Sequence, residues 1–284
     1  MSRFTFRQAL FLVALLALAT FGLGKGRAQM HRESHPVASD LAAATSRNVL
    51  LSNDLAWKFG NKAQRGWYLY TPLISRSLNT SNAVGSIGFA KSLAVWQRKL
   101  ALQPTGVLDE PTLYEMIKVW QGARLKDREV ASPDKLVLVP ISEFYDPTRA
   151  EELRWVERRT YQAYKKMVAA AVADRSLGLA HGAHGELATG EKFLKIVSAF
   201  RSREYQEKLR RESPNSGSAG LAVNSPHFTG RALDLYVGGE PVDTLDANRK
   251  LQVETRVYKW LVQHAERFGF RPYFYEPWHW EYVK

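Results

Sequence analysis

The chain has 284 residues, of which 45% are hydrophobic and 24% are charged. This balance is typical of a folded globular protein and excludes a chain that is disordered throughout. The sequence contains no cysteine, so disulfides and thiolate metal sites are excluded, and any metal ion must be held by His, Asp or Glu. The formal net charge of +12 favours an anionic partner, such as nucleic acid, anionic lipid or an anionic polymer.

The start of the chain has the layout of a secretory signal peptide. Arg3 and Arg7 form a basic start, residues 9–23 are almost wholly apolar, and Ala28 offers a small residue for cleavage. An uncleaved membrane anchor is the alternative, but the apolar run falls short of the roughly 20 residues that span a bilayer. We therefore expect a signal peptide at residues 1–28 and a protein secreted to the periplasm or cell wall. Such a protein has no stable membrane span after cleavage and does not meet nucleic acid as a partner.

Residues 29–79 show no clear periodicity, and we expect a partly ordered lead-in with Trp57 and Trp67 as its large apolar anchors. Between residues 80 and 125, apolar side chains recur at three- and four-residue spacing in two stretches, which predicts two short amphipathic helices. These side chains are Leu93, Trp96, Leu100, Leu113, Ile117 and Trp120. A turn that contains Gly106 separates the two stretches, and Asp109 can cap the second helix.

This helical unit resembles the peptidoglycan-binding module that accompanies many cell-wall hydrolases. The resemblance is carried by residues 95–97, the turn at residues 105–109, Thr112, and residues 120–121. It implies an all-α module at residues 80–125 that binds peptidoglycan. A helical spacer packed against the main domain is the alternative.

Beyond a charged, proline-containing linker at residues 126–149, predicted strands and helices interleave. Strands are predicted at residues 136–141, 193–200, 233–237 and 272–283, and helices at residues 148–174, 203–211 and 252–268. The fold class is therefore α+β. We expect a domain at residues 150–284 with a small antiparallel sheet and flanking helices, preceded by the small all-α module.

The first of two chemically informative segments runs from Ser225 to Asp234. Gly230 allows the chain to turn between His227 and the strand that follows. On that strand, Asp234 lies on the same face as the small side chain of Ala232. A buried carboxylate needs a cation, because burying it unpaired is costly. A neutral imidazole is no such cation, whereas a zinc ion shared by Asp234 and His227 is.

The second segment runs from Glu276 to Glu281. His279 lies between Trp278 and Trp280, so one face of this terminal strand is aromatic and the other carries His279 and Glu281. Three protein ligands and a water molecule are the arrangement of catalytic zinc, and two histidines with one carboxylate are a known ligand set. A glutamate close to the metal, but not bound to it, is the general base that such sites require.

The pattern SxHxxGxAxD followed by ExxH resembles the zinc D-alanyl-D-alanine carboxypeptidases of the VanY and VanX group. The resemblance extends over residues 150–284. It implies a Zn2+ ion held by His227, Asp234 and His279, with Glu276 as the general base.

The segment at residues 197–202 is similar to the SxYRS strand end of the same family, with Phe200 in place of the more usual tyrosine. The similarity implies that Arg201 points into the active site and stabilises the substrate carbonyl or the developing oxyanion. It also implies that Ser225 and Gln206 contact the substrate. An ion pair between Arg201 and Asp234 is the alternative.

Together these features predict an exported zinc carboxypeptidase that hydrolyses D-alanyl-D-alanine-type bonds in the stem peptides of peptidoglycan. One alternative is an endopeptidase that cuts within the stem peptide or the cross-link, because related metal sites serve both reactions. The other is a non-catalytic cell-wall-binding protein, although such a protein has no need for the base at Glu276. The two peptidase activities differ in whether a positive group closes the cleft to receive a free carboxylate.

Overall fold

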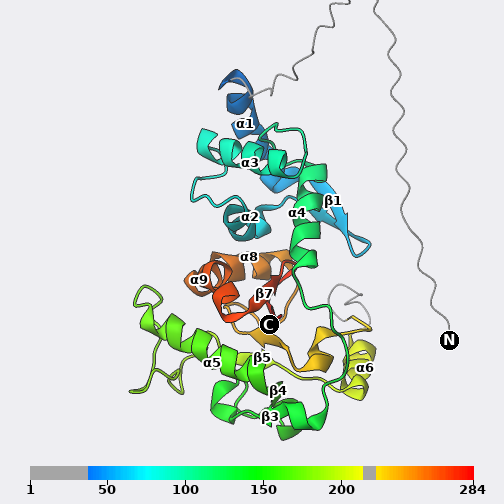
Figure 1. The fold of residues 1–284 in the computed structure, drawn as a ribbon, viewed down its shortest axis with the longest axis vertical. Coiled ribbons are helices and arrows are strands. Elements are labelled where there is room, and N and C mark those ends of the chain that lie inside the picture. The colour runs from blue at the N-terminus through cyan, green and yellow to red at the C-terminus, as the bar shows by residue number, and fades with distance from the viewer. Residues whose placement is uncertain (1–37, 214–221) are drawn as a thin grey trace, which may run out of the picture. The chain divides into compact units, whose positions relative to one another are not determined.

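A four-stranded antiparallel sheet lies at the centre of the C-terminal half of the chain (Figure 1). Its strands, in the spatial order β5-β6-β8-β7, are β5 (Ile196–Ser198), β6 (Ala232–Leu235), β8 (Glu276–Tyr282) and β7 (Phe270–Tyr273). The structure is a computed structural model that describes residues 38–213 and 222–284. The predicted signal peptide at residues 1–28 lies outside the described residues.

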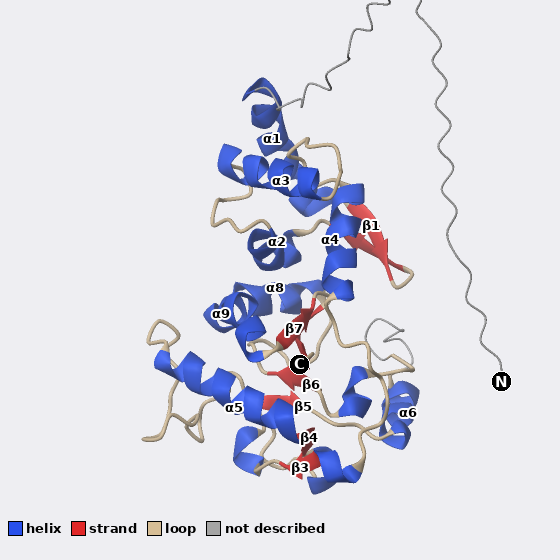
Figure 2. Ribbon diagram, viewed as in Figure 1, coloured by secondary structure: helices blue, strands red, loops and turns tan. Residues whose placement is uncertain are grey.

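Helices flank this sheet and account for most of the remaining elements (Figure 2). They are α5 (Arg158–Ala173), α6 (Arg203–Glu212), α8 (Asp246–Glu254) and α9 (Arg256–His264), with the 3-10 turns η6 (Pro226–Thr229) and η7 (Ala265–Phe268). Tyr164, Met167, Val168 and Ala171 of α5 recur at helical spacing and are buried in the hydrophobic core. The predicted α+β class is confirmed.

Two predicted helices differ from the observed ones because local hydrogen bonds end or begin them elsewhere. The helix expected at residues 148–174 begins only at Arg158, since β4 (Trp155–Glu157) first pairs with β3 (Leu136–Leu138). The helix expected at residues 252–268 is interrupted at Thr255, whose hydroxyl accepts the Tyr258 N–H and starts α9. A side-chain cap of this kind fixes a helix start that hydrophobic spacing alone does not reveal.

We define the N-terminal module as residues 38–125. Its elements are α1 (Ala38–Asp54), the hairpin β1 (Ala56–Phe59) and β2 (Lys62–Arg65), η1 (Tyr68–Tyr70), α2 (Thr71–Ser77), α3 (Ile87–Lys99) and α4 (Glu110–Gly122). The two helices expected from the spacing of apolar residues are α3 and α4. Buried Gln97 joins them, because its amide donates to the Val107 carbonyl and the Thr112 hydroxyl and accepts from the Gly106 N–H.

Residues 38–79, in the stretch where the sequence suggests only partial order, pack onto the same helices. The Trp67 ring stacks on Phe89 of α3 with 6.2 Å between ring centroids, and both rings are fully buried. The Asn48 side chain of α1 donates to the Gly106 carbonyl and accepts from the Leu108 N–H. The N-terminal module is therefore larger than the helix pair that the sequence suggests.

The expected linker at residues 126–149 contains β3 and the 3-10 turns η2 (Pro133–Lys135) and η3 (Ile141–Glu143), and η4 (Glu151–Leu153) follows it. Val139 and Phe144 of this segment are buried in the core, and the Ala131 N–H donates to the Phe228 carbonyl beside the functional site. None of the described helices is both long and apolar enough to cross a membrane.

Candidate metal centre and active site

The register of the central sheet brings three polar residues together. Asp234 of β6 pairs with His279 of β8 on one side and with Ser198 of β5 on the other. Directly paired residues in antiparallel strands project to the same face, so these three side chains are neighbours. Leu233 and Trp280, the next pair along, project to the opposite face and are fully buried.

His227 reaches this group from the loop before β6. The 3-10 turn η6 begins at Ser225, whose hydroxyl accepts the His227 N–H, and ends at Gly230 in the left-handed conformation (φ 65°). The His227 Nδ1 lies 2.6 Å from the Ala199 carbonyl oxygen, and its Nε2 lies 3.3 Å from Asp234 Oδ2. Since a carbonyl oxygen only accepts, Nδ1 carries the proton and Nε2 presents a lone pair to Asp234.

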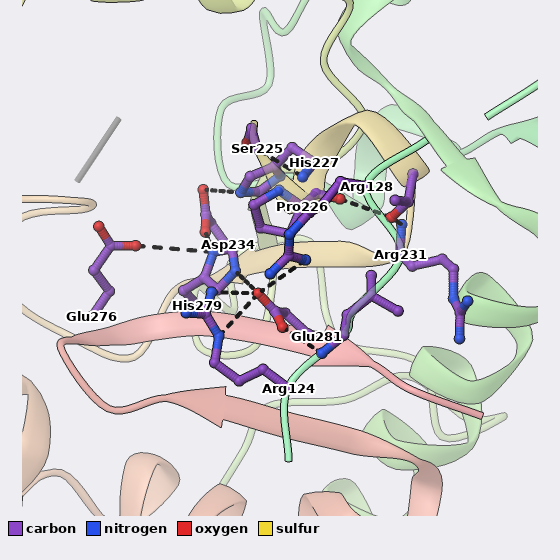
Figure 3. A network of polar contacts seen from close by, with 12 residues as sticks. Arg124, Arg128, Ser225, Pro226, His227, Arg231, Asp234, Glu276, His279 and Glu281 are labelled. Carbon is purple, nitrogen blue, oxygen red and sulfur yellow. Dashed lines mark hydrogen bonds and ion pairs between the residues drawn. The ribbon is translucent and has the colours of Figure 1, made fainter. Parts of the chain in front are cut away.

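His279 is held in the complementary way. Its Nε2 lies 3.2 Å from Glu281 Oε1, and its Nδ1 lies 2.8 Å from Asp234 Oδ1 (Figure 3). A carboxylate accepts the Nε2 proton and leaves Nδ1 to face Asp234 and His227. A ligating histidine that donates its other N–H to a carboxylate or a carbonyl is the usual outer-shell arrangement of protein metal sites.

These three side chains fit a metal ion. Ligand atoms of His227, Asp234 and His279 all lie within 4.8 Å of one another. Among the described residues, these three form the group whose geometry suits a metal ion. All three side chains are buried, and two imidazole nitrogens with one carboxylate oxygen form a donor set suited to zinc in a site with an open position.

Burial and mutual contacts shift the pKa values of all three side chains. Burial opposes charge on Asp234, but His227, His279 and Arg201 together hold its pKa well below the usual range. Burial also lowers the pKa of His227, to about 4, so this imidazole is neutral. For His279, hydrogen bonds to Asp234 and Glu281 outweigh burial and raise the pKa to about 9. A metal ion bound by His279 Nδ1 would take the place of the proton on that nitrogen.

Glu276 lies at the start of β8 and lines the same cleft. Its Oε2 is 3.9 Å from His279 Nδ1, and the side chain is almost fully buried. Burial raises the pKa of Glu276 to about 8, with Asp234 adding to the increase and His279 opposing it. A carboxyl group whose pKa has moved into the neutral range is suited to taking up and releasing a proton during catalysis.

Arg201 forms the ion pair that the sequence left as an alternative. Its Nη2 lies 2.8 Å from Asp234 Oδ2, while its Nε donates to the Ser198 hydroxyl and its Nη1 to Gln206 Oε1. Arg201 and Ser225 line the cleft. Gln206 lies behind Arg201 and donates to the Ala222 carbonyl, so its contacts support the arginine and do not form part of the cleft wall.

A cleft of about 440 Å³ lies over the group and is rich in arginine. Besides Arg201, its walls include Arg124, Arg128 and Arg149, all of which precede the expected domain start at residue 150. The buried Nε of Arg149 has no hydrogen-bond partner among the described residues. Sequence reasoning missed these three arginines, because no local pattern distinguishes them among the 40 lysines and arginines of the chain.

Glu281 is a second residue whose role the sequence did not reveal, although strand alternation correctly placed it on the face of His279. It is fully buried, and burial raises its pKa. Its contacts with His279 and Arg124 outweigh that effect and lower the pKa to about 2. Glu281 is therefore a carboxylate at neutral pH.

An α+β domain with a buried His, Asp, His group and an adjacent glutamate in an open cleft is typical of metal-dependent hydrolases. Residues 153–284 match the VanY family model, described as D-alanyl-D-alanine carboxypeptidase. The C-terminal half of the chain is therefore a VanY-family domain, and the protein is a peptidase.

Among solved structures, the chain is similar to the LdcB LD-carboxypeptidase, whose structure reveals the molecular basis of peptidoglycan recognition. The two are 25% identical, the match covers 54% of this chain and 69% of the other, and the TM-score is 0.38. No curated protein matches the sequence.

The turn that delivers His227 generates a testable prediction. A Cβ atom at Gly230 would lie 2.8 Å from Leu136 Cδ2 and 2.9 Å from the Glu157 nitrogen, and φ is positive there. We expect Gly230→Ala to lower the free energy of unfolding by about 2 kcal/mol, of which the left-handed backbone accounts for roughly 1. Urea denaturation measures this. Gly190→Ala is the matched control, because a Cβ there meets nothing within 4 Å; equal stability of the two variants would contradict the prediction.

Proposed function

We propose that this protein is an exported zinc carboxypeptidase that removes the terminal D-alanine from stem peptides of peptidoglycan. The observation that carries the proposal is the convergence of His227, Asp234 and His279 within 4.8 Å of one another, beside Glu276, in a domain of the VanY family. Membership of this family supports carboxypeptidase activity on peptidoglycan.

His227, His279 and Asp234 would hold the zinc ion, through Nε2, Nδ1 and a carboxylate oxygen respectively. Bound there, it would supply Lewis-acid chemistry, which acidifies water and polarises a carbonyl group. The protons on His227 Nδ1 and His279 Nε2 are held by Ala199 and Glu281 respectively, so both histidines offer the correct nitrogen without rearrangement.

The remaining chemistry belongs to Glu276 and Arg201. Glu276 takes the proton from the attacking water and then returns it to the amine of the leaving D-alanine. Arg201, within hydrogen-bond distance of Asp234 on the cleft wall, donates to the substrate oxygen on which negative charge develops. Its bonds to Ser198 and Gln206 keep the guanidinium in place, which reduces the cost of reorganisation in the transition state.

Arg149 favours a carboxypeptidase over an endopeptidase. Its guanidinium lines the cleft and interacts electrostatically with Arg201, Asp146 and Asp234, but it forms no ion pair with a carboxylate of the described residues. A partly buried arginine without an acid partner suits the free carboxylate of a terminal D-alanine, because a bidentate pair satisfies both groups. An internal peptide bond offers no such charge.

Two further features support action at the cell wall. Residues 1–28 have the layout of a signal peptide, and the turn between α3 and α4 resembles a peptidoglycan-binding module. If export is correct, intact mass measurement of the protein from the envelope fraction gives a chain that begins at residue 29. A mass that still includes residues 1–28 would count against cleavage.

Metal content and turnover can be separated by two substitutions. We expect elemental mass spectrometry to find about one zinc ion per chain in the purified protein and little in His279→Ala, which loses a ligand. Glu276→Ala keeps its zinc but loses turnover of a D-alanyl-D-alanine-terminated pentapeptide by roughly 10²- to 10⁴-fold, the usual contribution of general acid–base catalysis.

Glu254→Ala, which removes an exposed glutamate of α8, is the control and should retain both metal and turnover. Undiminished turnover in Glu276→Ala would remove Glu276 as the base. A wild-type protein that takes up no zinc even when zinc is supplied would instead favour a non-catalytic wall-binding protein.

The role of Arg149 predicts a specific loss. Since a hydrogen bond to a charged group contributes about 1.5–3 kcal/mol, Arg149→Ala should raise KM for the pentapeptide roughly 10- to 100-fold with a smaller change in kcat. The same pentapeptide with a C-terminal amide should be a poor substrate for the wild type, and the variant should no longer distinguish the two. Exposed Arg175 supplies the control substitution, Arg175→Ala. If Arg149→Ala still prefers the free acid, a group other than Arg149 receives the carboxylate. If the wild type cuts the amide as well as the free acid, the endopeptidase alternative gains support.

A further inference from the structure

The N-terminal module contacts the metal centre through a buried ion pair. Arg124 follows directly after α4 and its cap, and its Nε and Nη2 lie 3.2 and 2.5 Å from Glu281 Oε1. The Leu125 N–H donates to the other oxygen, Oε2, at 2.9 Å. Figure 3 shows Glu281 between Arg124 and His279. The carboxylate of Glu281, 157 residues from Arg124 in the sequence, thus joins the end of the N-terminal module to the metal ligand His279.

The ion pair determines what Glu281 can do for His279. Glu281 is fully buried, and Arg124 is the nearer of its two cations, since Arg128 Nη1 lies 3.9 Å from Oε1. A buried carboxylate that loses its close cation is destabilised. With Arg124 and the Leu125 N–H in place, both carboxylate oxygens are fixed and Oε1 accepts the His279 Nε2 proton. Arg124 therefore acts on His279 through Glu281, and it holds the imidazole with Nδ1 directed at Asp234.

A second contact holds the other end of the same strand. Phe274, in the turn just before Glu276, packs against three aromatic rings of the N-terminal module. The centroid distances are 4.7 Å to Phe59, 5.3 Å to Tyr70 and 5.8 Å to Trp120. The Arg124 guanidinium also lies 3.9 Å above the ring of Tyr273, which contacts His279 edge-on. The N-terminal module thus contacts β8 both before Glu276 and after His279.

We propose that the N-terminal module is a working part of the metal centre, with Arg124 and Glu281 as positioning residues that orient His279 for the metal ion. This inference rests on the metal centre described under Proposed function. It assigns to a segment outside residues 153–284 a role in metal affinity, separate from any contact that the module makes with the cell wall. The domain at residues 153–284 is by itself incomplete as a metal-binding unit.

The test measures metal affinity in the full chain. Zn2+ affinity is determined by competition with a chromophoric chelator, and the visible absorption of Co2+ reports the geometry of the site. Outer-shell substitutions typically weaken metal binding 10- to 100-fold. We expect losses of roughly this size in Glu281→Gln and Arg124→Ala, a changed Co2+ spectrum in both, and a smaller loss in Arg124→Lys, which keeps the charge but not the paired donors.

Arg76→Ala is the matched control. Arg76 of α2 pairs with Glu266 of η7, so it is a second arginine–glutamate pair between the N-terminal module and the VanY-family domain, but it does not line the metal cleft. It should leave Zn2+ affinity and the Co2+ spectrum unchanged, even where it lowers the melting temperature. In the double variant Arg124→Ala/Glu281→Gln, the loss in affinity should be smaller than the product of the two single losses, because both residues act on the same bond.

An Arg124→Ala variant that folds, as judged by circular dichroism, and binds Zn2+ within twofold of the Arg76→Ala control would overturn the inference. If Arg124→Ala does not fold, the same comparison is made with Arg124→Lys and Glu281→Gln, and unchanged affinity in both is equally decisive. A wild type that binds no metal overturns this inference together with the proposed zinc centre. A wild type that binds Zn2+ but leaves the pentapeptide uncut contradicts only the proposed substrate.

Discussion

The carboxylate of Asp234 is the group on which the functional half of the structure depends. Its side chain is almost fully buried in a central strand, where an unpaired charge is prohibitively costly. Arg201, His227 and His279 all reach it, and each comes from a different segment of the chain. The need to satisfy this one charge explains why these segments converge at one point.

Each partner of Asp234 is in turn fixed by a second group that leaves it little freedom. Ser198 and Gln206 hold Arg201, and the Ala199 carbonyl holds His227. Glu281 holds His279, and a residue of another module holds Glu281. Polar networks in a low-dielectric interior are stable only when every member is satisfied. The network therefore extends outward until it reaches groups, such as Arg124, that retain some contact with solvent.

The sequence predicted the parts of this arrangement that local rules govern. Strand alternation predicted that Asp234 shares a face with Ala232, and His279 with Glu281. Gly230 has a positive φ in the turn that was expected there. The strand register and the side-chain contacts that bring in Arg124 and Arg149 follow from packing between segments far apart in sequence, which no local period encodes. Helix boundaries failed for the same reason, because the pairing of β4 with β3 removed ten residues from the start of the expected helix at residues 148–174.

The N-terminal module and the VanY-family domain share one hydrophobic core, so their stabilities are linked. One continuous cluster of buried side chains includes Trp67 and Leu113 of the N-terminal module as well as Trp280 of β8. Phe274 shows how this works locally, since its ring belongs to the VanY-family domain but most of its aromatic neighbours belong to the module. Buried aromatic groups of this size contribute strongly to stability and have preferred contact geometries. Because the strand that carries Glu276 and His279 borders this shared core, a change in the packing of the module reaches the functional site through packed side chains.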